Sequence, residues 1–337
     1  AGCDNLTTVT LGGSPTAVSD SMFDGCTALT AIHLPDTVTS IGASAFRNCT
    51  ALTSIDIPPR VTKIGNYAFQ KSGLTSVVVP DTVTSLGTYT FQGCAALTSA
   101  TVGEGVATIG NYTFGDCTAL TEVTLPADLK EIGRSAFYGC TALTAIDIPF
   151  GVTKVGSNAF EKSGLIAAVL PDTVTSLGTY AFQNCTSLTS VDVGAGLTKL
   201  DTRTFYGCTA LAGVTLPAGL KEIGSNAFQD CTALSEVTLP AGLEEIGSSA
   251  FQNCTALSAI IIPEGVTTIG NYVFKNTGLT SVSVPGSVTS LGTYVFQDCA
   301  ALTSAAFGEG INAIPNYTFD GCAALSEVTL PATLTEI

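Results

Sequence analysis

Phenylalanine recurs along this chain at a nearly constant interval. Fourteen of the 16 Phe residues lie 23 or 22 residues apart, at Phe23, Phe46, Phe69, Phe91, Phe114, Phe137, Phe160, Phe182, Phe205, Phe228, Phe251, Phe274, Phe296 and Phe319. A fixed period of this length predicts a solenoid, because one coil cannot bury its apolar side alone and must stack on its neighbours. We therefore expect residues 1–337 to form a single solenoid of about 14 repeats of 22–23 residues, cut in mid-repeat at both ends.

The repeat has the pattern L-T-x-V-x-L-P-x-x-V-T-x-I-G-x-x-A-F-x-x-C-T-A, as in residues 29–51. In L-x-x-V-x-L, the alternation of aliphatic and polar residues predicts a short half-buried strand that ends at Pro. V-T-x-I predicts a second short strand that runs into Gly, which permits a turn with positive φ. We interpret A-F-x-x-C as one helical or 3₁₀ turn that returns the chain to the next coil.

This pattern resembles the leucine-rich repeats, and within them the BspA-like subclass with 23-residue units, over essentially the whole chain. The resemblance implies an α/β repeat solenoid, a right-handed horseshoe or arc, made mostly of short parallel β-strands with short helical or 3₁₀ turns. Its parallel sheet would line the concave side. The resemblance also implies a protein that is secreted or displayed on the surface of bacteria or parasitic protists, where it would act in adhesion.

Composition and charge narrow the range of functions. With 45% hydrophobic and 12% charged residues, the chain has the apolar content of a folded protein. Its formal charge of −15 repels phosphate backbones, so we expect no nucleic-acid partner. The chain contains no apolar run of 18 residues, so we expect no membrane insertion within this segment.

Neither end of the chain shows a capping repeat with a polar outer face, which solenoids normally need. The sequence therefore favours a piece of a longer protein. We expect its exposed end strands to be able to pair with another copy, end to end.

The 12 Cys residues occupy one repeat position, three residues after Phe, except where a short repeat lacks it. They are Cys3, Cys26, Cys49, Cys94, Cys117, Cys140, Cys185, Cys208, Cys231, Cys254, Cys299 and Cys322. This spacing predicts an inward row of reduced, buried thiols. Some disulfides remain an alternative, since neighbouring coils lie about 5 Å apart, although parallel side chains do not readily adopt the S–S torsion. No C-x-x-C or Cys/His cluster occurs, so we expect no metal and no cofactor.

Three repeats, at residues 52–73, 143–164 and 257–278, have 22 residues. Each lacks the Cys and ends in Gly, namely Gly73, Gly164 and Gly278. The missing residue predicts a tighter turn. Two interpretations stay open: these repeats are a trace of tandem duplication, or they mark regularly spaced binding or bending points.

The candidate binding surface has two parts. Two residues before Phe, Tyr recurs in consecutive repeats and predicts two aromatic strips, Tyr67, Tyr89 and Tyr112, and then Tyr272, Tyr294 and Tyr317. The strips are either simple ring stacks over the turn or contact surfaces. The outward columns of the first strand add His33, Asp56, Glu122, Asp147 and Asp192.

These polar residues do not form a catalytic constellation. His33 and Asp56 lie on adjacent repeats and could hydrogen-bond, but no Ser or Cys nucleophile is predicted beside them. A smooth repeat face offers no cleft in which paired carboxylates could act on a glycoside. We therefore expect no enzyme.

Three functions are compatible with the sequence. The leading hypothesis is a non-enzymatic recognition or adhesion module, extracellular or at the cell surface, that binds a protein or glycan of a host or neighbouring cell. The alternative is a structural spacer or stalk of a larger surface protein. The third is an ice-binding solenoid, although Lys130, Ala212 and Lys221 interrupt its Thr rows. A binding face should concentrate differences between repeats in one column, whereas a spacer would scatter them.

Overall fold

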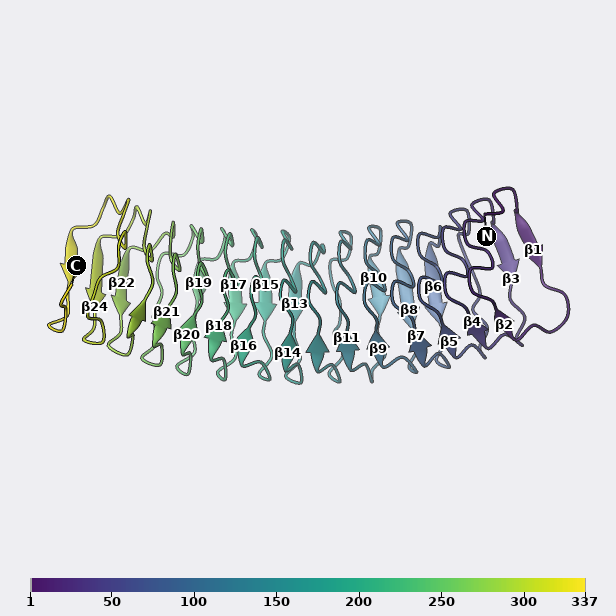
Figure 1. The fold of residues 1–337 in the computed structure, drawn as a ribbon, viewed down its shortest axis with the longest axis horizontal. Helices are drawn as coiled ribbons and strands as arrows, with labels where there is room; N and C mark the ends of the chain where they lie inside the picture. The colour runs from purple at the N-terminus through teal and green to yellow at the C-terminus, as the bar shows by residue number, and fades with distance from the viewer. Residues whose placement is uncertain (1, 337) are drawn as a thin grey trace. The chain divides into compact units, whose positions relative to one another are not determined.

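Short parallel strands, two in most coils, form the framework of the computed structural model (Figure 1). The structure describes residues 2–336, and the chain divides into two compact units, residues 1–165 and 166–337. We call the strands of the L-x-x-V-x-L segment leading strands and those of the V-T-x-I segment second strands. Both kinds are present in each unit, and within a unit each coil stacks on the coil before it.

The leading strands alternate inward and outward side chains. In the first unit they are β1 (Thr8–Thr10), β3 (Ala31–His33), β6 (Ser76–Val79), β8 (Ser99–Val102) and β10 (Glu122–Thr124). In the second unit they are β13 (Ala167–Val169), β15 (Ser190–Asp192), β17 (Gly213–Thr215), β19 (Glu236–Val237), β22 (Ser281–Val284), β24 (Ser304–Phe307) and β25 (Glu327–Thr329). In β6, for example, Val77 and Val79 are buried while Ser76 and Val78 are exposed, as the period of two requires.

The second strands are two residues long and end just before the Gly of the repeat, except that Ser19 follows β2 and Asp201 follows β16. In the first unit they are β2 (Ala17–Val18), β4 (Ser40–Ile41), β5 (Lys63–Ile64), β7 (Ser85–Leu86), β9 (Thr108–Ile109), β11 (Glu131–Ile132) and β12 (Lys154–Val155). In the second unit they are β14 (Ser176–Leu177), β16 (Lys199–Leu200), β18 (Glu222–Ile223), β20 (Glu245–Ile246), β21 (Thr268–Ile269) and β23 (Ser290–Leu291).

The register places equivalent repeat positions side by side. Ala100 in β8, for example, pairs with Val77 on one side and Val123 on the other. Each repeat position therefore becomes a column that runs across the coils. Inside, the Phe column forms a stack of rings, with neighbouring centroids 5.3 to 5.5 Å apart from Phe23 to Phe160. The Phe period of the sequence is thus the period of the core.

The predicted helical turn is wrong. Residues 2–336 contain no α-helix or 3₁₀ helix, so the fold is a parallel-strand β-solenoid of about 14 coils and not an α/β solenoid. In every coil the residues two before and two after Phe have positive φ, as Ser44 (54°) and Asn48 (59°) do around Phe46. A helix of L-residues cannot continue through the left-handed region, so the A-F-x-x-C segment folds as consecutive turns.

Backbone hydrogen bonds alternate in direction through these turns. Phe46 N donates to Ala68 O of the next coil (2.7 Å) and Asn48 N to Gln70 O (2.8 Å), whereas Arg47 N donates to Ser44 O of its own turn (3.2 Å). The turns therefore continue the inter-coil ladder, and they satisfy the buried backbone groups that a helix would otherwise have satisfied.

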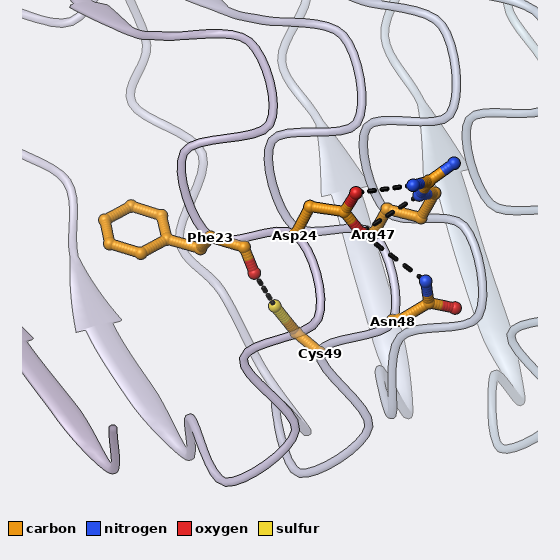
Figure 2. A network of polar contacts seen from close by, with 5 residues as sticks. All are labelled: Phe23, Asp24, Arg47, Asn48 and Cys49. Carbon is orange, nitrogen blue, oxygen red and sulfur yellow. Dashed lines mark hydrogen bonds and ion pairs between the residues drawn. The ribbon is translucent and has the colours of Figure 1, made fainter. Parts of the chain in front are cut away.

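The side chains of the turn also join coils. Figure 2 shows Asp24 accepting hydrogen bonds from Arg47 Nε (2.9 Å) and Asn48 Nδ2 (3.4 Å) of the following coil. It also shows the thiol of Cys49 donating to the carbonyl oxygen of Phe23 across 3.1 Å. All 12 Cys are free, and ten are buried, while Cys322 is half-buried and Cys3 exposed. The predicted row of reduced thiols is confirmed for those ten.

Substitutions at Gly93 test the left-handed conformation of the turn. It lies two residues after Phe91 with φ of +70°, and its N–H donates to Gly115 O of the next coil (2.8 Å). Gly93→Val should lower the free energy of unfolding by about 1–2 kcal/mol, because a β-branched residue is strained in this region. Gly93→Asn should cost much less, since Asn tolerates this conformation and occupies the same position at residue 48. Urea denaturation followed by circular dichroism measures both, and equal losses would contradict the assignment.

Candidate binding surface

The outward face of the leading strands is the most varied surface of the repeat. Its two columns lie two and four residues after the first Leu, because the residues between them point into the core. The column four residues after Leu carries His33, Asp56, Val78 and their equivalents in later coils. The inward columns, by contrast, are almost uniformly aliphatic. The differences between coils on the leading face therefore lie in its outward columns.

This face is interrupted at each of the three 22-residue repeats, which we call the short coils. No strand is present at residues 53–57, 144–148 or 258–262. In the first unit the leading strands accordingly form separate sheets, β1-β3 and β6-β8-β10, and in the second unit the order β13-β15-β17-β19 stops before β22-β24-β25. The sequence marks these positions by the missing residue, by the Gly that ends the repeat and by Ile at both inward positions of the leading segment.

A specific hydrogen bond is lost at each interruption. In regular coils the residue after the first Leu donates its N–H to the coil before it, as Thr98 does to Thr75 O (2.8 Å) and Thr121 to Thr98 O (2.9 Å). Within the described residues, the equivalent Thr53, Thr144 and Ser258 donate no such bond. The short coil and the coil before it therefore leave unpaired backbone groups facing each other.

The short turn contacts the preceding coil closely, directly before the next leading segment begins at Leu74. Gly73 N donates to Cys49 O (3.1 Å), and a Cβ at Gly73 would collide with the carbonyl oxygen of Thr50. The hydroxyl of Ser72 takes the place of the missing thiol and lies 3.3 Å from Cys94 Sγ. The Cys column thus stays filled, while residues 53–57 form no strand and the short coil is joined to the following coil by Thr75 N, which donates to Thr53 O (3.0 Å).

Three shallow grooves have one wall on a short coil. The Asp56 groove is lined by Ser54–Ile57 and Ser76–Val78 together with Pro59 and Pro80, and has a volume of about 310 Å³. The Asp147 groove, about 410 Å³, is lined by Thr121–Leu125, Ala145–Asp147 and Pro149. The Ile261 groove, about 290 Å³, is lined by Glu236–Leu239 and Ala259–Ile261. Each groove contains a carboxylate, and neither Lys nor Arg lines any of the three.

Two of these grooves also expose an aliphatic side chain. Val78 is 64% exposed in the Asp56 groove, and Ile261 is 85% exposed in the Ile261 groove. Val169, in the same column of the second unit, is 63% exposed. The leading face thus exposes aliphatic side chains in both units.

The structure separates the polar residues that the sequence singles out. Asp56 lines one groove, and Glu122 and Asp147 line another together. His33 and Asp192 are exposed at the ends of β3 and β15 but line none of the described grooves. No hydrogen bond joins His33 to Asp56 among residues 2–336, because Asp56 belongs to a short coil that does not pair with β3.

The tyrosine strips are continuous stacks. Centroids of Tyr67 and Tyr89, and of Tyr89 and Tyr112, are 4.8 Å apart with nearly parallel rings. The second strip repeats this geometry, with distances of 4.7 and 4.8 Å along Tyr272, Tyr294 and Tyr317. Burial, and then the neighbouring phenols, raise the pKa of Tyr89. Since each ring covers the face of the next, a strip presents ring edges and hydroxyls to solvent.

Sequence comparison identifies the repeat. The model of the BspA type leucine-rich repeat region matches residues 1–98, 62–189, 107–235, 175–303 and 221–337, which together span the chain. The chain belongs to the BspA type leucine-rich repeat family. A search of curated protein sequences gave no match.

Solved structures of leucine-rich repeat proteins support the assignment of this BspA type chain to the family. It is similar to a leucine-rich repeat protein from Bacteroides ovatus, with 28% identity and a TM-score of 0.76 over 97% of this chain and 85% of that one. It also resembles a leucine-rich repeat protein from Eubacterium ventriosum (28% identity, TM-score 0.56, 79% and 81% covered). A leucine-rich cell surface protein from Faecalibacterium prausnitzii matches with 25% identity and a TM-score of 0.50, over 96% of this chain and 86% of that one.

Proposed function

We propose that this chain is the recognition module of an extracellular or cell-surface protein and binds a partner protein through its leading face. One observation carries the proposal: the outward column four residues after Leu exposes Val78, Val169 and Ile261, while the inward positions of the same segments are buried aliphatics. Exposed aliphatics in one column are difficult to explain for a spacer, which needs only solubility.

A protein partner fits the surface better than a glycan. Sugars stack on exposed ring faces, but in the interior of each tyrosine strip both faces of Tyr89 and of Tyr294 are covered by neighbouring rings. The leading face instead offers shallow grooves with exposed aliphatics and carboxylates, which suit the side chains of another protein. The strips would then contribute hydroxyl contacts at the edge of the interface.

Family membership supports location and mode of action. The similar protein from Faecalibacterium prausnitzii is described as a cell surface protein, and the other two structures are leucine-rich repeat proteins. Leucine-rich repeat proteins generally bind other proteins rather than catalyse reactions, which supports a non-enzymatic module here. Over residues 2–336 the structure contains no helix capable of crossing a bilayer.

An array experiment tests the proposal. Purified chain is applied to arrayed extracellular host proteins, bacterial surface proteins and surface glycans, beside a Val78→Thr/Ile261→Thr variant. Thr occupies the same column at Thr101 and Thr124, so the variant should fold. We expect binding to proteins, reduced about tenfold or more in the variant because apolar contacts are lost.

Met22 provides the matched control. It is 45% exposed but lies beside Phe23 in the turn, where seven other repeats have Ala. Met22→Ala should bind as the parent chain does. Binding to glycans alone would contradict the protein partner, and binding to nothing on the array would favour the spacer.

A further inference from the structure

The leading face carries carboxylates that no basic side chain of this protein neutralises. Asp56, Glu122, Asp147 and Glu236 make no ion pair among residues 2–336. All four line grooves that have a short coil as one wall. Their charges therefore remain available to a partner.

The second strands show the opposite arrangement. Glu131 pairs with Lys154 at 2.8 Å, Glu222 with Lys199 at 2.8 Å and Glu244 with Lys221 at 2.9 Å, each across neighbouring coils. The repeat is thus able to place a Lys beside a Glu in the next coil, and it does so on the second strands. The unpaired acids on the leading face contrast with this internal neutralisation.

The same grooves contain unpaired backbone groups. At the Asp147 groove, residues 144–148 form no ladder with β10, so one edge of β10 and the facing segment lack strand partners. A free strand edge presents N–H and C=O groups that an extended chain can bind. The groove is bounded by two extended segments, Thr121–Leu125 and residues 145–149, which favours an extended occupant lying along it.

We propose that each short coil creates a binding site for an extended, basic segment of a partner protein. A Lys or Arg side chain of that segment meets Asp56, the Glu122 and Asp147 pair, or Glu236. Its aliphatic stem packs on Val78 or Ile261 where these are present. This inference rests on the proposed function and specifies the chemistry of the partner: positive charge, in keeping with the net charge of −15.

The two sites of the first unit are regularly spaced. Asp56 and Asp147 occupy equivalent positions four coils apart, which corresponds to about 19 Å at the usual spacing of neighbouring strands. A partner with two basic segments at this separation would gain from binding both at once, since the second contact is intramolecular. The short coils would then be spaced binding points rather than traces of duplication alone.

The test uses a fluorescein-labelled octapeptide of alternating Lys and Thr, with an alternating Glu and Thr peptide for comparison. Fluorescence anisotropy measures binding to the complete chain, and hydrogen exchange with mass spectrometry locates it. In the free protein, amides of residues 144–148 should exchange faster than those of β10. The Lys peptide should slow exchange at 144–148 and at 53–57, and the Glu peptide should not.

Two double variants distinguish binding in the groove from nonspecific electrostatic attraction to an acidic protein. Glu122→Gln/Asp147→Asn should abolish protection at residues 144–148, leave protection at 53–57 unchanged, and weaken binding at that groove about three- to tenfold. Asp192→Asn/Glu327→Gln makes the same chemical change at the same repeat positions, but in β15, which pairs on both sides, and in β25, which pairs with β24, and neither strand adjoins a short coil. This control should retain protection at both sites.

Three results would overturn the inference. The first is an equal loss of Lys-peptide binding in the two double variants. The second is binding of the Glu peptide as tight as that of the Lys peptide. The third is that the Lys peptide protects no short coil from hydrogen exchange. None of them would decide the proposed function, because the protein array detects partners of any charge. If the array gives a partner whose binding the groove variant leaves unchanged, the recognition function stands and the groove inference fails.

Discussion

Raising the pH from 8 to 11 in a reducing buffer should unfold this protein at room temperature. The cause is the Cys column, in which eight thiols with no exposed surface have raised pKa values: Cys49, Cys94, Cys117, Cys140, Cys208, Cys231, Cys254 and Cys299. Burial, which disfavours the thiolate, is the main cause for each. It raises the pKa of Cys94 to about 11 and those of Cys49 and Cys140 to about 12.

The direction of the effect follows from the difference in thiol pKa between the unfolded and the folded chain. In the unfolded chain these thiols lose their protons near pH 8.5 to 9, whereas in the folded chain burial raises their pKa values, to about 11 for Cys94 and about 12 for Cys49 and Cys140. The stability linked to the thiols is therefore fully present below about pH 9 and is lost as the pH rises towards the folded values. Each such thiol lowers the free energy of unfolding by about 1.4 kcal/mol per pH unit in this range. The summed effect of a few such thiols outweighs the free energy of unfolding of a typical protein, which is about 5–15 kcal/mol.

Circular dichroism melts at pH 7, 8, 9, 10 and 11 measure the effect. Cys117→Ala/Cys231→Ala should have a lower melting temperature at pH 7, because methyl-sized cavities remain, but a shallower decline above pH 9. Cys3→Ala changes an exposed thiol and should follow the parent curve. If the Cys117→Ala/Cys231→Ala decline were as steep as that of the parent chain, ionisation of Lys and Tyr rather than of buried thiols would be responsible.

The sequence predicts the core of this fold well because every core position recurs. A column such as Phe23 to Phe160 is buried in each coil, and the period alone requires that equivalent residues stack. The repeat spacing does not predict the conformation of the turn, because the spacing of residues carries no information on their φ angles. Its signal was present in the residue types: Gly, Asn or Asp stands two residues after Phe in most repeats, and these residues favour the left-handed region.

The binding surface was less predictable than the core. Exposure of Asp56, Glu122 and Asp147 follows from strand alternation, but the grooves they line depend on which hydrogen bonds the short coils lose. A missing residue predicts a tighter turn, as at Gly73, and does not reveal that the leading segment of the same coil forms no strand. Val78 and Ile261 appear as single aliphatic residues in sequence, and the structure places Val78 in one groove with Asp56 and Ile261 in another with Glu236.

Replacing one ring of the Phe column should have the largest effect of any single substitution. Phe114 has no exposed surface, and its ring lies 5.4 Å from that of Phe91 and 5.5 Å from that of Phe137, centroid to centroid. Phe114→Ala should lower the free energy of unfolding by about 3–5 kcal/mol, from lost burial and the cavity that remains. Phe114→Leu should cost less, because it fills most of the volume and loses mainly the ring stacking.

A substitution at Phe150 provides the matched control, because Phe150 lies outside the Phe column. It belongs to the same unit and is 72% exposed, so Phe150→Ala is the same chemical change without a cavity and should alter stability by about 0.5 kcal/mol or less. Because each coil contacts only its neighbours, a defect at Phe114 should also divide the urea transition into two phases, as the coils on either side unfold at different concentrations. A single transition shifted as little by Phe114→Ala as by Phe150→Ala would show that the ring stack does not couple the coils.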